Sequence, residues 1–418
     1  MVVESWMARA ARERPDVRAV NDLTYAALYE RARAAAAGLP RGARVGLAIP
    51  PGLDYVVALH ACLLAGALVV PIDLRLTEAE RPAVDLTFTG AVRCSPEADV
   101  RDVHDLDDPA ILVHTSGTTS APKPIRLTYG NWLWSALGSA VALGVDPDER
   151  WLCTLPLSHV GGLSILLRSA IYGTTAIVHE RFETDRVLEA LRAPGGPTIV
   201  SLVPTTLARL LDAGLTRPPA LRWALLGGAP LPPALLARAA DAGVPVAPTY
   251  GLTEACSQVA TAGVPLFCTR VELEADGEIV VSGPTVSPDA GAGDGVLRTG
   301  DLGAFDDEGR LSIVGRKADT IVTGGENVAP AEVEAVLEGH PGVLEAAVVA
   351  RPDDEWGEAI VALVRPRDGA VPPSDDELRA HCAERLARFK VPKAYILIGD
   401  PLPRTGSGKL VRRSLPTP

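Results

Sequence analysis

Strand-like and helix-like patterns alternate through residues Arg44–Ala247, and this alternation constrains the fold more than any other feature. Short β-rich runs such as Ala67–Ile72 and Thr175–Val178 are separated by segments with helical spacing of apolar residues, such as Leu53–Ala65 and Tyr129–Leu143. Parallel strands need a crossover connection, which a helix commonly supplies. We therefore predict an α/β fold with a large N-terminal domain of mixed sheets flanked by helices.

A different pattern begins after Thr261, where β-rich runs follow one another without intervening helices. Leu273–Val281, Gly295–Thr299 and Leu311–Val314 are predicted strands separated by turns of Gly and Asp. These runs indicate a β-rich subdomain that belongs to the large N-terminal domain.

A chain of 418 residues is longer than one hydrophobic core usually serves, so a second domain is expected. The last hundred or so residues supply it, with a helix predicted at Pro330–Leu337 and a strand at Glu358–Val364. We predict an N-terminal domain over residues 1–315 and a small, mobile α+β C-terminal domain over residues 319–418. The hinge between them is expected near residues 316–319.

Charge, hydropathy and cysteine spacing exclude several classes of protein. The net charge of −12 argues against a nucleic-acid-binding protein. The longest apolar run, around Val56–Pro71, is interrupted by His60 and Gly66 and is too short for membrane insertion. The six cysteines form no CxxC pair and the first residues do not resemble a signal peptide, so we expect a cytoplasmic location. A homodimer is an expectation that the sequence leaves open.

Lysine is rare in this chain, and its positions carry information. Coding bias explains a low number of lysines, whereas a need for a compact cation would explain where the remaining ones lie. From His381 to the end, eight basic residues oppose two acidic ones, which favours contact with a polyanion such as a phosphate-rich small molecule. Of the 40 basic residues five are lysine, namely Lys123, Lys317, Lys390, Lys393 and Lys409.

The loop after the predicted strand Ala110–His114 gathers hydroxyls, a glycine and a lysine. Backbone N–H groups and hydroxyls of such a loop can surround phosphate oxygens. It is not a Walker A loop, because Lys123 is followed by Pro124. A surface turn rich in Ser and Thr would explain the pattern equally well. The candidate phosphate-binding residues are Thr115, Ser116, Gly117, Thr118, Thr119 and Lys123.

Further motifs follow in the second half of the chain, and each is weak alone because Gly and Asp turns are mostly structural. Tyr250 offers a stacking face, and Glu254 offers a hard oxygen ligand suited to Mg²⁺. Asp301, in a tight turn after a strand, can accept ribose hydroxyls. The motifs lie at Thr249–Glu254, Arg298–Gly303, Gly315–Asp319 together with Gly324–Val328, and Pro403–Lys409.

Taken in this order, the motifs resemble those of the acyl-adenylate-forming superfamily, and the resemblance spans nearly the whole chain. Leu23–Leu28 and Gly66–Ile72 are similar to N-terminal signatures of the same superfamily. The resemblance implies an enzyme that activates a carboxylic acid with ATP and Mg²⁺, releases pyrophosphate, and transfers the acyl group from acyl-AMP to CoA.

The resemblance also implies roles for individual residues. Lys409 would bridge carboxylate and phosphate during adenylation, Thr253 would contact the α-phosphate, and Glu254 would bind Mg²⁺. Gly325 and Glu326 would lie on the face that serves thioester formation after the small domain rotates. Other implied contacts are with adenine (Gly228, Ala229, Pro230, Tyr250 and Gly251), with ribose and phosphate (Asp301 and Arg316), and with pyrophosphate (the loop from Thr115 to Lys123). The hinge position, which is usually charged or an amide in the superfamily, is Ala318 here, beside Lys317.

The stretch Leu155–Phe182 is most similar to the 2-succinylbenzoate–CoA ligase branch, which acts in menaquinone biosynthesis. His159 matches the position that gates the site or contacts the reacting carboxylate. Because 2-succinylbenzoate has two carboxylates, Arg168 is a candidate counter-charge, although a surface or helix-packing role explains it as well. Ser201 and Thr205, at a strand end, are expected to line the acyl pocket.

Two other enzymatic functions fit much of the same pattern. One is another aryl- or medium-chain acyl-CoA synthetase, which would need an apolar tunnel without a second cation. The other is a standalone adenylation enzyme that loads a carrier protein and lacks a CoA site on its small domain. A catalytically inactive binding protein is a third interpretation, against which Glu254, Asp301 and Lys409 count.

Overall fold

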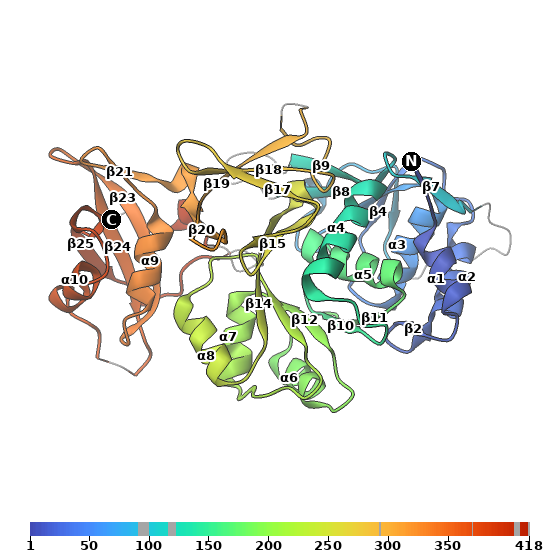
Figure 1. Cartoon of the computed structure of the whole chain (residues 1–418), viewed down its shortest axis with the longest axis horizontal. Coiled ribbons are helices and arrows are strands. Elements are labelled where there is room, and N and C mark those ends of the chain that lie inside the picture. The colour runs from blue at the N-terminus through green and yellow to red at the C-terminus, as the bar shows by residue number, and fades with distance from the viewer. Residues whose placement is uncertain (91–99, 116–122, 292–293, 370, 405–409, 417–418) are drawn as a thin grey trace.

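The computed structural model describes residues 1–90, 100–115, 123–291, 294–369, 371–404 and 410–416. Figure 1 shows an elongated molecule with residues from Ile321 onward at one end of its long axis. Helices α1 (Trp6–Glu13) and α2 (Tyr25–Ala36) lie at the other end. The sheets that carry most of the predicted site residues lie between these two ends.

A nine-stranded sheet forms the centre of the N-terminal part. Its core is parallel from β11 to β14, and β15 and β16 continue it in antiparallel register. Parallel strands align their carboxyl ends at one edge, where ligands of such sheets gather. The strand order is β16 (Val264–Pro265), β15 (Ser257–Thr261), β14 (Val246–Leu252), β13 (Trp223–Leu226), β12 (Ile199–Leu202), β10 (Arg150–Cys153), β11 (Thr175–Val178), β2 (Arg18–Val20) and β3 (Leu23–Thr24).

Helices cover both faces of this sheet, as the alternating sequence pattern predicts. On β10, Trp151 and Cys153 pack into the core that contains α4 and α5, whereas Leu152 packs into the core on the opposite face. Successive side chains of a strand point to opposite faces, so strands buried on both sides are apolar throughout. The helices are α4 (Tyr129–Leu143) and α5 (Val160–Tyr172) on one face, and α6 (Thr184–Arg192), α7 (Pro204–Asp212) and α8 (Pro233–Asp241) on the other.

A second, five-stranded sheet packs into the same core as α4 and α5. The buried helix α3 (Leu53–Ala65) connects two of its parallel strands and has the bounds that the sequence predicts, as does α4. A short pair, β1 (Val2–Glu4) and β7 (Val103–Asp105), lies beside it. The strand order is β6 (Leu86–Phe88), β4 (Arg44–Leu47), β5 (Leu68–Pro71), β8 (Pro109–Thr115) and β9 (Lys123–Thr128).

An antiparallel sheet of four strands forms the predicted β-rich subdomain. The prediction of one strand over Leu273–Val281 is wrong, because residues 274–277 form a turn, closed by a hydrogen bond from the Gly277 N–H to the Glu274 carbonyl, that separates β17 from β18. Gly277 has a φ of +84°, which a turn accepts and an extended strand does not. The strands in order are β17 (Arg270–Leu273), β18 (Glu278–Ser282), β19 (Val296–Phe305) and β20 (Leu311–Arg316).

The C-terminal part has its own sheet and its own hydrophobic core. Its long antiparallel pair β23–β24 packs against α9 (Pro330–Glu338) and α10 (Asp375–Ala383). A single 3-10 turn, Lys317–Asp319, joins this part to β20. The division at residues 316–319 and any motion about it stay predictions. The strands are β22 (Glu326–Val328), β21 (Ile321–Thr323), β24 (Gly357–Pro366), β23 (Val343–Asp353) and β25 (Ala394–Leu397).

None of the described helices is both long enough and apolar enough to span a bilayer.

Candidate adenylate-forming site

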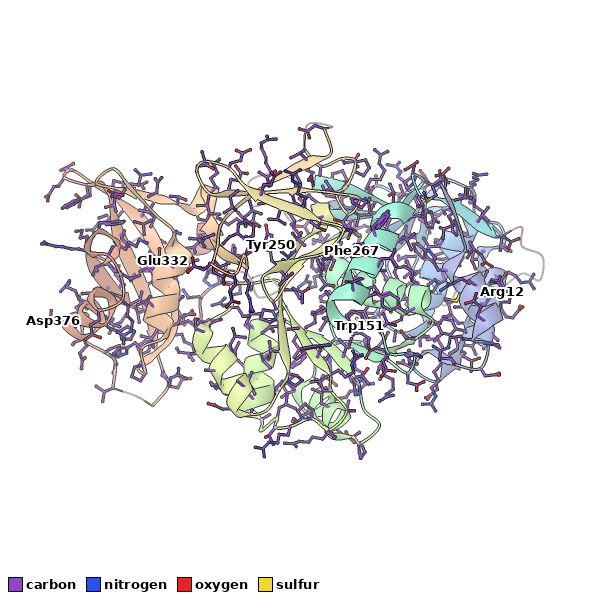
Figure 2. The ribbon with its side chains drawn as sticks, viewed as in Figure 1. Arg12, Trp151, Tyr250, Phe267, Glu332 and Asp376 are labelled. Atoms are coloured by element: carbon purple, nitrogen blue, oxygen red, sulfur yellow. The ribbon has the colours of Figure 1, made fainter. Side chains whose placement is uncertain are left out.

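The carboxyl edge of the parallel sheet brings several predicted site residues together. His159 is the N-cap of α5 just beyond β10, Thr205 lies in the first turn of α7 beyond β12, and Gly228 follows β13. Ala229 and Pro230 continue that turn. Tyr250 and Gly251 lie further along β14, where the strand extends past its neighbour β13. Figure 2 shows Tyr250 in the middle of the molecule, on the side of the large part that faces the C-terminal part.

Tyr250, Asp301 and Arg316 form one hydrogen-bonded cluster. The Tyr250 hydroxyl donates to Asp301 Oδ2 at 2.7 Å, and Arg316 Nε lies 2.7 Å from Asp301 Oδ1. Asp301 and Arg316 are paired neighbours on β19 and β20, and Asp301 is 5% exposed. Burial and the nearby Asp301 carboxylate raise the pKa of Tyr250, so its hydroxyl keeps its proton and donates. Direct contacts therefore bring these three residues together, and their role toward a nucleotide stays a prediction.

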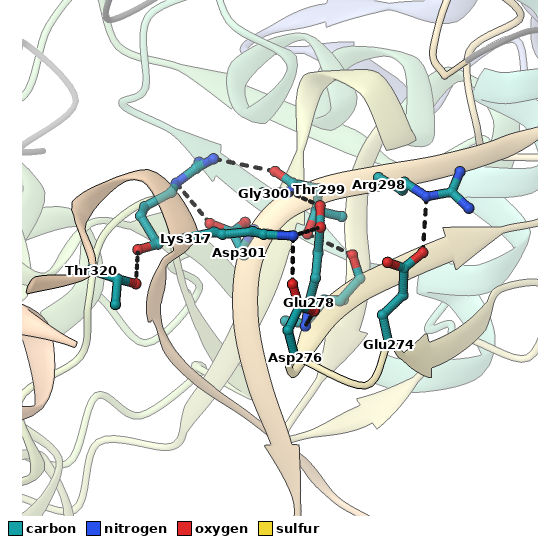
Figure 3. Close-up of polar contacts among 11 residues, drawn as sticks. Glu274, Asp276, Glu278, Arg298, Thr299, Gly300, Asp301, Lys317 and Thr320 are labelled. Atoms are coloured by element: carbon teal, nitrogen blue, oxygen red, sulfur yellow. Dashed lines mark hydrogen bonds and ion pairs between the residues drawn. The ribbon is translucent and has the colours of Figure 1, made fainter. Parts of the chain in front are cut away.

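A second charged network contacts the backbone next to Asp301 and includes Glu278, which the sequence analysis did not single out (Figure 3). Glu278 accepts a hydrogen bond from the Gly300 backbone N–H at 3.0 Å and one from Lys317 Nζ at 2.7 Å. Lys317 also lies 2.6 Å from Asp276 Oδ2. The hydrogen bond from Lys317 lowers the pKa of Glu278. The network fixes the turn before Asp301. In the sequence, Glu278 could have been noticed as the one charged residue of the otherwise apolar run Glu278–Ser282.

The Thr253–Glu254 motif lies in a tight turn between β14 and β15. Gly251 is required there, because a Cβ at this position would lie 1.7 Å from the Ser257 carbonyl oxygen. Glu254 is half-buried, and its carboxylate forms no ion pair with any residue that the structure describes. A partly desolvated carboxylate without a protein cation, next to a threonine hydroxyl, has the chemistry of a Mg²⁺ ligand. The donor set therefore fits the predicted ion.

Only the two ends of the predicted phosphate loop belong to the described residues. Thr115 ends β8 and pairs with Lys123 at the start of β9, and the Thr115 hydroxyl donates to the Lys123 carbonyl at 3.3 Å. The antiparallel strands β8 and β9 thus hold the two ends of the loop together. Ser116, Gly117, Thr118 and Thr119 lie outside the described residues.

The residues that are predicted to contact the carboxylic acid substrate differ in their surroundings. Ser201 is 5% exposed and its hydroxyl accepts a hydrogen bond from Trp151 Nε1 at 3.0 Å. Arg168 is 2% exposed, so the alternative of a surface residue is wrong. Its Nη2 donates to the Ser135 hydroxyl at 3.0 Å. Contact of these residues with a substrate stays a prediction.

The C-terminal part presents its predicted residues differently. Gly325 and Glu326 belong to an exposed β-hairpin between β21 and β22. Gly324 and Gly325 have φ values of +59° and +84°, the pattern of a two-residue hairpin turn that glycine accommodates without strain. Lys409 lies outside the described residues, but its flanks Arg404 and Leu410 form a β-bridge.

Comparison with known proteins places the chain in a family. The sequence profile described as AMP-binding enzyme matches residues 7–84 and 83–288, and the profile of the AMP-binding enzyme C-terminal domain matches residues 332–409. The chain belongs to the AMP-binding enzyme family. Within it, a 2-succinylbenzoate–CoA ligase from Bacillus licheniformis is 37% identical over 98% of this chain and 99% of its own length.

Solved structures of AMP-binding enzymes share the architecture of a large N-terminal and a small C-terminal part. The o-succinylbenzoate CoA synthetase of Bacillus subtilis with its acyl-adenylate intermediate has a TM-score of 0.88 and 33% identity, covering 99% of this chain and 98% of that one. Its complex with ATP and magnesium ion has a TM-score of 0.88, 32% identity and coverage of 99% and 100%. A double mutant of the same enzyme with a product analogue has a TM-score of 0.70, 33% identity and coverage of 99% and 98%.

Proposed function

We propose that this chain is an ATP- and Mg²⁺-dependent acid–CoA ligase that converts 2-succinylbenzoate to 2-succinylbenzoyl-CoA. The observation that carries the proposal is the buried Asp301 carboxylate held between the Tyr250 hydroxyl and Arg316, close to the turn that presents Glu254. This arrangement offers a ribose acceptor, a stacking ring and a phosphate-directed cation. The ligases of Bacillus named above support the choice of acid.

In the first half-reaction, a carboxylate oxygen of the acid forms a bond with the α-phosphorus of ATP, and the bond from that phosphorus to pyrophosphate breaks. An anion attacks a polyanion here, so charge neutralisation dominates the barrier. Lys409, Lys123 and a Mg²⁺ ion held by Glu254 would supply it, and Thr253 would donate to the α-phosphate. Mg²⁺ contributes charge stabilisation of the phosphate oxygens.

In the second half-reaction, the CoA sulfur attacks the acyl carbon, AMP leaves, and the thiol proton is released. We propose that residues 319–418 rotate about residues 316–319 between the two steps, bringing Gly325 and Glu326 to the site. The higher TM-score with the adenylate complex than with the product-analogue complex supports two arrangements of the same parts. Ala318 would act as a hinge residue without a side-chain charge.

The acid pocket is proposed to involve His159, Ser201 and Thr205. His159 would contact the reacting carboxylate, whereas Ser201 and Thr205 would line the aryl-binding end. A cytoplasmic location and a homodimeric state remain predictions, to be checked by cell fractionation and analytical ultracentrifugation.

A pyrophosphate-release assay over a panel of acids, with and without CoA, tests the proposal. We expect 2-succinylbenzoate to be the fastest substrate, with multiple turnovers only when CoA is present. Preferred turnover of benzoate or octanoate would indicate another acyl-CoA synthetase. Pyrophosphate exchange without any CoA thioester would instead indicate an enzyme that loads a carrier protein.

A further inference from the structure

Arg168 is a buried cation without an anionic partner among the described residues. Its side chain, on α5, is 2% exposed, and its Nε has no hydrogen-bond partner within that part of the chain. Burial lowers its pKa, although arginine stays charged. An uncompensated buried charge is expensive, so a fold that keeps one must hold it by other interactions.

Two neutral groups take the place of a carboxylate beside this cation. The Arg168 Cζ lies 5.7 Å from the centroid of the Trp151 ring, within the range of a cation–π interaction. On another side, Arg168 Nη2 donates to the Ser135 hydroxyl of α4, which is 1% exposed. Figure 2 shows Trp151 within the large part, away from the C-terminal part.

Ser135 also forms a hydrogen bond with the backbone, so it links Arg168 to a main-chain carbonyl. A hydroxyl that accepts from a cation directs its own proton elsewhere, and Ser135 Oγ donates to the Cys256 carbonyl at 2.7 Å. Consecutive hydrogen bonds of this kind strengthen one another, particularly when the first donor is charged. The buried charge of Arg168 therefore reinforces a hydrogen bond to one specific carbonyl group.

That carbonyl belongs to a strained turn. Cys256 has a φ of +52° and Ser257 a φ of +89°, the left-handed region that non-glycine residues rarely adopt. Such a conformation is strained and persists only where the surroundings hold it in place. The Cys256 N–H donates to the Thr253 carbonyl at 3.0 Å, so the strained pair and the Thr253–Glu254 motif form one turn.

We propose that Arg168 is a positioning residue for the nucleotide side of the site. Acting through Ser135, it holds the left-handed turn at Cys256 and so fixes the direction in which Thr253 and Glu254 are presented. This inference rests on the proposed function, because it takes Glu254 as the Mg²⁺ ligand. It differs from the sequence-based prediction, in which Arg168 pairs with the second carboxylate of the substrate.

The test compares Arg168→Met, Arg168→Lys and Ser135→Ala with the wild-type chain. Ser139→Ala is the matched control, because Ser139 is equally buried one turn further along α4. The readouts are the Mg²⁺ concentration for half-maximal ATP–pyrophosphate exchange, the KM for 2-succinylbenzoate, and calorimetric binding of Mg·ATP, which needs no acid.

We expect Ser135→Ala and Arg168→Met each to raise the Mg²⁺ requirement about tenfold, the effect of losing a charge-assisted hydrogen bond. Mg·ATP binding should weaken in parallel, and the KM for the acid should stay within about twofold. Arg168→Lys should restore part of the loss. The variant that combines Arg168→Met with Ser135→Ala should need no more Mg²⁺ than the more impaired single variant, because both residues act through the Cys256 carbonyl. Ser139→Ala should match the wild type.

Two results would overturn the inference. One is a raised KM for 2-succinylbenzoate in Arg168→Met with normal Mg²⁺ dependence in Ser135→Ala, which would make Arg168 a substrate contact. The other is a lowered melting temperature with unchanged Mg²⁺ dependence in all variants, including Arg168→Lys, which would make the role purely structural. A wild-type chain that binds Mg·ATP but turns over no acid would contradict the proposed function instead, and the calorimetric comparison would still decide this inference.

Discussion

Buried histidines in the large N-terminal part and a buried glutamate in the C-terminal part give the two parts opposite pH dependence of stability, because burial favours the neutral form of each group. In the N-terminal part, burial lowers the pKa values of His60 and His104 to about 4, so both are neutral bases. In the C-terminal part, burial raises the pKa of Glu338 to about 7. The two parts also have separate hydrophobic cores. The contrast indicates that each part has its own pH response.

The same two parts also differ in how they hold the candidate site. Asp301 of the large part is 5% exposed and is fixed by Tyr250 and Arg316, whereas Glu326 of the C-terminal part lies on an exposed hairpin. A buried, interlocked cluster is preorganised to bind a nucleotide. In the rotation proposed above, Glu326 would reach the site only in the second half-reaction.

The largest expected effect comes from Lys409→Ala. If the C-terminal part supplies only this cation to the first step, adenylation measured by ATP–pyrophosphate exchange should fall by about 100-fold or more. Transfer of the acyl group from synthetic 2-succinylbenzoyl-AMP to CoA should remain largely intact. Normal exchange in the variant would remove Lys409 from the proposed chemistry.

The next effect concerns the fixed cluster of the large part. Asp301→Ala removes the acceptor of the Tyr250 hydroxyl and the partner of Arg316, so the KM for ATP should rise about 10- to 100-fold. The KM for the acid should change little. Steady-state kinetics with each substrate varied in turn make the measurement, and an unchanged KM for ATP would contradict the assignment of Asp301.

The pH contrast gives a third prediction, on the order of 3 kcal/mol for each of the three groups. Below about pH 6.5 the unfolded chain protonates His60 and His104 while the folded chain does not, so acid from pH 6.5 towards 4 should destabilise the N-terminal part. Folded Glu338 keeps its proton between pH 4.5 and about 7, so the C-terminal part should lose stability as pH rises through that range.

Hydrogen exchange monitored separately in the two parts would measure this difference. Glu338→Gln should remove the dependence in the C-terminal part only, which makes it the matched control for the histidines. Parallel pH responses in both parts would contradict the comparison.

The smallest effect is expected at the link between the parts. Lys317→Met removes ion pairs with Asp276 and Glu278, but the lysine side chain is 48% exposed, so solvent screens its charge, and Glu278 keeps its hydrogen bond from the Gly300 N–H. Urea unfolding should therefore shift only slightly. The ratio of the adenylation rate to the thioester-forming rate should change measurably. An unchanged ratio would show that Lys317 does not control movement between the two parts.

Much of the fold could be predicted because local patterns and tertiary structure agree. The helices Leu53–Ala65 and Tyr129–Leu143 have the predicted bounds, since their apolar faces are buried and their ends are set by Gly66 and Thr128. The turn inside Leu273–Val281 was missed because the flanking β-rich residues continue the pattern on both sides. The strand β9 was missed because it depends on pairing with β8 rather than on its own composition.

The candidate site was predictable in its residue types but not in its contacts. Tyr250, Asp301 and Arg316 lie far apart in the sequence, and only the pairing of β19 with β20 brings the last two together. Nothing local to Ser135 marks it, because a serine within an apolar helix is ordinary. Its importance follows from the burial of Arg168 and the strained turn at Cys256, both of which are properties of the folded chain.

Direct detection of the acyl-adenylate tests the central claim. The chain is mixed with ATP, Mg²⁺ and 2-succinylbenzoate without CoA, quenched with acid, and analysed by mass spectrometry. We predict 2-succinylbenzoyl-AMP in an amount close to that of the enzyme, and its conversion to the thioester when CoA is added before the quench. Formation of ADP with an acyl phosphate, or of the thioester with no adenylate under any condition, would contradict the account.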